Sequence, residues 1–148
     1  MAEHAHEHHH EHDHAHGHEH SHERSVDLGF TRVELSSHMH EQAATVSATL
    51  ALAQGTTFPF GRLSGALQAI AEQSEAQGGI VGHIKAYAET DKGFAHASCT
   101  DAALGTTSEG GDGFVLDSAA KIQLVTIVML IDLHALEHIV ADSLKSLA

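Results

Sequence analysis

Histidine recurs at almost every second position from residue 4 to residue 22. A segment of this kind cannot contribute to a hydrophobic core, so any folded domain must form from the residues that follow it. The imidazoles alternate with Glu, Asp, Ala and Gly, so the segment has almost no apolar surface to bury. Without burial, nothing offsets the conformational entropy that the chain would lose on ordering. We therefore predict a disordered segment over residues 1–24, called the His-rich tail, and one folded domain over residues 25–148. Residues 25–31 would form the linker between them.

Alternation of apolar and polar residues predicts the first long strand of the domain. Over residues 42–53, Ala, Val and Leu alternate with Thr and Ser, which is typical of a half-buried strand. The same stretch also fits a helical stripe, so a helix is the alternative. A short strand at residues 32–35 is expected before it. A helix is expected over residues 61–77, where two glycines follow its last turn.

The middle of the chain predicts a β-hairpin. Residues 80–89 and 94–100 are expected to pair around a four-residue loop, with Glu89 opposite Phe94. This register gathers Cys99 and the alanines on one face and the charged and aromatic side chains on the other. A slip of one residue would mix the two faces, so the clean separation favours this register.

The C-terminal third predicts a loop, a strand and a helix. The Gly-rich residues 101–117 are expected to form a long loop. Residues 121–131 are apolar on both faces and rich in β-branched side chains, so they are expected to form the most buried strand. Asp132 would then cap a helix that continues to about residue 147. A single helix over residues 118–147 is the alternative.

The resulting element order, β-α-β-β-β-α, predicts the fold class. It implies a small α+β two-layer sandwich, with a mostly antiparallel sheet and two helices packed on one face. The second face of the sheet would be exposed or used for self-association. The chain contains no Trp, one Tyr and five Phe, so the core is expected to be aliphatic.

The chemistry of the His-rich tail predicts metal binding. Neutral imidazole is a good ligand for nickel, zinc and cobalt, and neighbouring carboxylates can complete a coordination shell. With four ligands per ion, the imidazoles of the tail would hold roughly two or three ions. The predicted ligands are His4, His6, His8, His9, His10, His12, His14, His16, His18, His20 and His22.

The run His-Ala-His-Glu-His-His-His-Glu-His-Asp-His at residues 4–14 resembles the His-rich regions of nickel-handling accessory proteins for hydrogenase and urease. It is also similar to His-rich segments of zinc transporters. The resemblance covers the tail alone and implies metal storage or delivery without naming a pathway. Residues 25–148 carry no such resemblance. They lack a Gly-rich loop ending in Gly-Lys-Ser/Thr, so nucleotide hydrolysis is not implied.

A second metal motif is expected on the C-terminal helix. His134 and His138 stand four residues apart, so they share a helix face at a metal-binding spacing. The pattern H-x-x-E-H resembles the inverzincin protease motif, which would make Glu137 a general base. That family takes its third ligand, a Glu, from far downstream, whereas ten residues follow His138. A polar helix face, a metal site and a small metal-dependent enzyme all remain open.

The other histidines form pairs of less specific meaning. His38 and His40 point the same way in an extended chain, so they could extend the ligand set of the tail or share an ion with the helical pair. A solvent-exposed pair is the alternative. His83 and His96 lie roughly 13 Å apart along the predicted hairpin, too far to share one ion within a protomer.

Charge and composition exclude several classes of function. The net charge is -13, and Lys and Arg occur singly, so neither nucleic acid nor an anionic membrane is an expected partner. Cys99 is alone, and no apolar N-terminal stretch resembles a secretory signal, so we expect a cytoplasmic protein.

These observations predict a metal-binding accessory protein that stores, buffers or delivers Ni²⁺, Zn²⁺ or Co²⁺. The expected partners are the ions, a metalloenzyme client and a second copy of the chain. The alternatives are a small metal-dependent enzyme and an interaction domain whose tail buffers metal incidentally.

Overall fold

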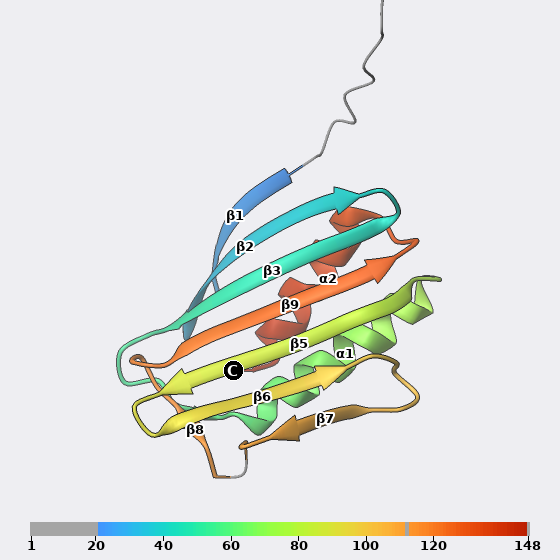
Figure 1. Ribbon diagram of the computed structural model, residues 1–148. Helices are drawn as coiled ribbons and strands as arrows, with labels where there is room; N and C mark the ends of the chain where they lie inside the picture. Colours follow the sequence, from blue (N-terminus) through green and yellow to red (C-terminus); the bar gives the residue numbers. More distant parts are fainter. Residues whose placement is uncertain (1–20, 112, 148) are drawn as a thin grey trace, which may run out of the picture.

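A seven-stranded antiparallel sheet carries helices α1 and α2 on one face (Figure 1). The computed structural model describes residues 21–111 and 113–147. The strand order is β1-β2-β3-β9-β5-β6-β7, and β4 pairs with β8 in a separate two-stranded sheet. This arrangement confirms the predicted two-layer α+β fold. The elements are β1 (Ser21–Asp27), β2 (Thr31–His40), β3 (Ala43–Leu52), β4 (Phe58–Pro59), α1 (Gly61–Ala76), β5 (Ile80–Thr90), β6 (Gly93–Cys99), β7 (Thr106–Glu109), β8 (Val115–Leu116), β9 (Lys121–Met129) and α2 (Leu133–Lys145).

The two longest apolar stretches form the centre of the sheet. Strand β3 buries every second side chain beneath the helices, so the strand prediction is confirmed and the helical alternative is wrong. Strand β9 lies between β3 and β5 and pairs with both. It buries Ile122, Leu124 and Val128 on the helix side, while Val125 and Met129 are each 38% exposed on the other. The sequence of β9 is apolar on both faces, but helices cover one face of the sheet only, so the side chains on the other face stay partly exposed.

The hairpin β5–β6 has the predicted register. Glu89 pairs with Phe94 and Tyr87 with His96, and the ladder continues to Thr90 opposite Gly93. Only two residues then remain in the turn, which ends at Gly93 with a φ of 133°. Glycine tolerates this backbone conformation without the steric cost that a side chain would bring.

Helix α2 begins as the sequence indicates. The Asp132 side chain accepts a hydrogen bond from the backbone N–H of Ala135 at 3.0 Å, which caps the helix. Because residues 121–129 form β9, the alternative of one helix over residues 118–147 is wrong. The apolar face of α2 meets α1 and strands β2 and β3, so the core lies between the helices and the sheet. No helix within residues 21–111 and 113–147 is long and apolar enough to cross a membrane.

Two stretches expected to be irregular contain strands. Residues 21–24, assigned to the disordered tail, and residues 25–27 of the predicted linker form β1, which pairs with β2 along its whole length. The predicted loop at residues 101–117 contains β7 and β8. Strands β1 and β7 escaped prediction because they bury little: Val26 alone in β1 is even partly buried. Their backbone hydrogen bonds, not apolar alternation, hold them in the sheet. Strand β8 is only two residues long, although its Leu116 is fully buried.

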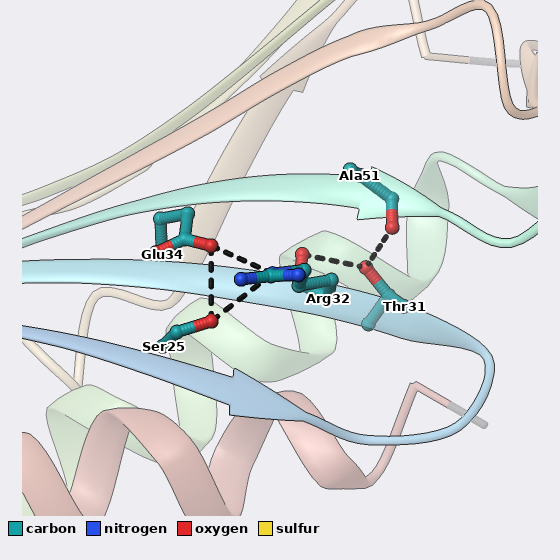
Figure 2. Close-up of polar contacts among 5 residues, drawn as sticks. All are labelled: Ser25, Thr31, Arg32, Glu34 and Ala51. Carbon is teal, nitrogen blue, oxygen red and sulfur yellow. Dashed lines mark hydrogen bonds and ion pairs between the residues drawn. The ribbon is translucent and has the colours of Figure 1, made fainter.

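A polar cluster on the helix-free face also ties β1 to β2 (Figure 2). The Nε–H of Arg32 donates to the Ser25 hydroxyl at 3.1 Å and to the Glu34 carboxylate at 2.8 Å. Ser25 donates to the same carboxylate oxygen at 3.0 Å. These hydrogen bonds, with that from Arg32 the stronger influence, hold the pKa of Glu34 below its usual value.

Candidate metal centre

Strand β1 brings one histidine of the tail against the folded domain. The register sets His22 directly opposite Ser37 of β2, and both side chains lie on the face that carries the helices. The first turn of α2 contributes His134 and Glu137 to the same place. One ligand atom from each of His22, His134 and Glu137 lies within 4.8 Å of the other two, so this cluster could hold a metal ion. We call it the β1–α2 centre.

The two imidazoles flank one carboxylate. The Nδ1 of His22 lies 3.9 Å from Oε1 of Glu137, and the Nδ1 of His134 lies 3.6 Å from Oε2. The imidazole rings are 5.2 Å apart between centroids. The histidine side chains are 43% and 66% exposed, whereas that of Glu137 is 8% exposed. The carboxylate therefore forms the floor of the centre and the imidazoles form its rim.

Glu137 is an unusual residue for its position. It lies among the inward-facing residues of α2 and is only 6% exposed. Its Oε1 accepts a hydrogen bond from the hydroxyl of Ser37, which is itself buried. Within the described part of the chain, no Lys or Arg forms an ion pair with this carboxylate. A buried carboxylate normally needs a cation or several hydrogen bonds to offset its lost hydration.

The other predicted ligands that the structure describes, His38, His40 and His138, lie apart from this centre. The ligands predicted from His4 to His20 fall outside the described residues. His38 and His40 lie on the helix-free face of the sheet, so β2 separates them from His134 and no ion can be shared with the helical pair. His138 is exposed on α2, and it is not one of the three residues of the centre.

The hairpin residues have other surroundings. His83 and His96 both line a hollow of about 440 Å³ that also includes Lys85 and Tyr87. The Nε2 of His96 lies 3.2 Å from the Glu109 carboxylate. Burial, and secondarily the charge of Lys85, lowers the pKa of His83. Cys99 is buried in the core, as the hairpin register predicts.

Sequence reasoning named all three side chains of the centre but did not bring them together. It joined His134 to His138 by helical spacing and left His22 in the disordered tail. It also missed Ser37. One signal was available: Glu137 lies four residues after Leu133 and three before Val140, within the apolar stripe of the helix. A charged residue in that stripe indicates a buried carboxylate that needs partners.

Comparisons with known proteins add no relatives: no family model matches the chain, and no significant match was found among curated proteins or solved structures.

Proposed function

We propose that this chain is a metal-binding accessory protein that stores, buffers or delivers Ni²⁺, Zn²⁺ or Co²⁺ through its His-rich tail. One observation carries the proposal: the last histidine of the run, His22, lies beside His134 and Glu137 of the folded domain. A continuous series of ligands in the sequence thus ends at a cluster of ligands with fixed positions. This continuity supports a route between tail and domain for the ion.

The donor types support transition metals rather than calcium or magnesium. Imidazole nitrogen predominates in the tail, and the β1–α2 centre offers two imidazoles and one carboxylate. Hard cations such as Ca²⁺ and Mg²⁺ prefer an all-oxygen shell, whereas zinc, nickel and cobalt accept imidazole readily. Ligands carried by consecutive residues of a polar segment bind with modest affinity when the segment must order around the ion. Modest affinity suits buffering and transfer.

The folded domain would determine which protein receives the ion, by binding to that protein. The helix-free face of the sheet exposes large side chains on neighbouring strands, including Tyr87 and Phe94, whose rings stack at 5.9 Å. Val125 and Met129 of β9 are also partly exposed on this side. Such a face could contact a metalloenzyme client or a second copy of the chain.

Calorimetric titration with Ni²⁺ and Zn²⁺ tests the proposed function. The matched variant is a full-length chain in which the ten histidines before Ser21 are replaced by Asn, which preserves length and acidity. We expect roughly two or three ions for the natural chain and about one for this variant, because four imidazoles serve each ion. A control that replaces His38, His40 and His138 should keep the full stoichiometry. Equal stoichiometry in the natural chain and the tail variant would refute the proposal.

A further inference from the structure

The three side chains of the β1–α2 centre come from opposite ends of the chain. His22 belongs to the first strand, whereas His134 and Glu137 belong to the last helix. The antiparallel ladder between β1 and β2 fixes His22 opposite Ser37, and the Ser37 hydroxyl holds the carboxylate of Glu137. The cluster therefore exists only when the domain is folded and β1 is in place.

The spacing of the ligand atoms suits a small transition-metal ion. Ligands about 2.0–2.1 Å from a tetrahedral ion lie roughly 3.3 Å from one another. The imidazole nitrogens of His22 and His134 lie 3.9 and 3.6 Å from different oxygens of Glu137, Oε1 and Oε2. One ligand atom from each residue lies within 4.8 Å of the other two, so the set must contract when the ion binds. The two imidazoles are exposed enough for their side chains to make this adjustment. The buried carboxylate is already held by Ser37 and needs to move least.

Electrostatics favours an ion at the same point. Glu137 is buried, and its neighbours in the described part of the chain are two imidazoles and a hydroxyl, with no Lys or Arg. A divalent cation would supply the positive charge that this carboxylate lacks. We propose that His22, His134 and Glu137 bind one divalent transition-metal ion of the zinc or cobalt type, and that the ion fastens strand β1 to helix α2.

The coordination shell of this ion has room for an exchangeable ligand. Two imidazoles and one carboxylate leave a fourth tetrahedral position for water or an incoming group. A hollow of about 350 Å³, lined by His22, Met39, Asp132, Leu133 and His134, adjoins the two imidazoles. An imidazole of the tail could occupy the fourth position, so the centre accepts ions from the tail or returns them. This exchange rests on the proposed function, whereas the binding of the ion does not.

Thermal stability distinguishes an ion bound at the β1–α2 centre from ions bound in the tail. Ligands that are close together in sequence can bind an ion in the unfolded chain as well, so ions bound to the histidines before Ser21 should leave the unfolding equilibrium almost unchanged. The β1–α2 centre exists in the folded chain alone, so an ion bound there raises the melting temperature. A metal-induced rise in melting temperature therefore reports on this centre even in the complete protein.

The experiment is thermal unfolding of full-length protein with and without Zn²⁺. At free zinc about a hundred times the dissociation constant, we expect the melting temperature to rise by about 10 °C. The variant without the ten histidines before Ser21 should keep this rise. His22→Gln and His134→Gln should lose it, while His138→Gln, on the same helix but outside the centre, should keep it. Without zinc, the His22→Gln, His134→Gln and His138→Gln variants should melt near the natural protein, because these three side chains are exposed.

Co²⁺ provides a second readout that does not depend on stability. Bound to the tail variant, it should give the visible absorption of a four-coordinate ion, and His134→Gln in that background should lose it. The proposed centre would be overturned if the zinc-induced rise in melting temperature survives His22→Gln and His134→Gln, or if the natural protein shows no rise. Failure of the proposed function gives a different pattern: the tail variant would then bind as many ions as the natural chain.

Discussion

Replacing Ser37 by Ala should weaken both the fold and the metal centre, because the Ser37 hydroxyl donates to the buried Glu137 carboxylate. Ser37 is 2% exposed and Glu137 6% exposed, so water cannot readily replace the lost donor. A hydrogen bond to a charged group contributes about 1.5–3 kcal/mol to stability. For a domain of this size, each kcal/mol corresponds to about 3–5 °C in melting temperature. Ser37→Ala should therefore lower the melting temperature by about 5–15 °C without metal.

The same substitution should weaken zinc binding at the β1–α2 centre. A side chain that orients a metal ligand typically contributes about 10–100-fold to metal affinity. Thermal unfolding of the full-length protein, with and without Zn²⁺, measures both effects. Ser36→Ala is the matched control, since Ser36 precedes Ser37 on β2 and lies exposed on the opposite face. Its effect should stay within about 0.5 kcal/mol. If the two variants have the same stability and zinc affinity, the inferred role of Ser37 is wrong.

Three further predictions concern single positions in the fold. Leu130 is 55% exposed and has a φ of 61°, so Leu130→Gly should raise the free energy of unfolding by about 0.5–1 kcal/mol in urea titration. A Cβ at Gly79 would lie 2.8 Å from Cγ1 of Val128 and 2.9 Å from a backbone oxygen of α1, so Gly79→Ala should lower that free energy by about 1–3 kcal/mol in the same titration. Burial, then Lys85, lowers the pKa of His83, so the unfolded chain takes up its proton first as the pH falls. Stability should therefore drop as the pH falls below about 6.5, and His83→Gln should drop less in melting curves between pH 7.5 and 5.5; an equal drop would contradict the assignment to His83.

The central elements of the fold could be predicted because their signals are local. The alternation in β3 and in the β5–β6 hairpin shows which side chains face the helices, and a one-residue slip would destroy that pattern. Asp132 likewise caps its helix through a contact only three residues away. The signal that predicts each of these elements lies within the element itself.

The edge strand and the metal centre could not be predicted because they depend on pairing between distant segments. Strand β1 buries almost no apolar surface, so its sequence resembles the polar tail that precedes it. Without β1, nothing relates His22 to Ser37, and without Ser37 the buried carboxylate of Glu137 loses its hydrogen-bond donor. His134 and His138 do lie on one helix, as their spacing predicts. The ligands that lie close to His134, however, are His22 of β1 and Glu137 on the inward side of α2.

The polar character of β1 also determines how this sheet can meet another copy of the chain. An exposed edge with long, apolar strands invites intermolecular pairing and fibrous aggregation. Here the two outermost strands are β1, which exposes Glu23, Arg24 and Asp27, and the short β7. The charged side chains of β1 at one edge and the short length of β7 at the other disfavour edge-to-edge pairing between copies of the sheet. A chain that begins at Phe30 would lack β1 and expose the ten-residue β2 as an edge strand. We expect this shortened chain to precipitate by edge-to-edge pairing under conditions in which the natural chain remains in solution.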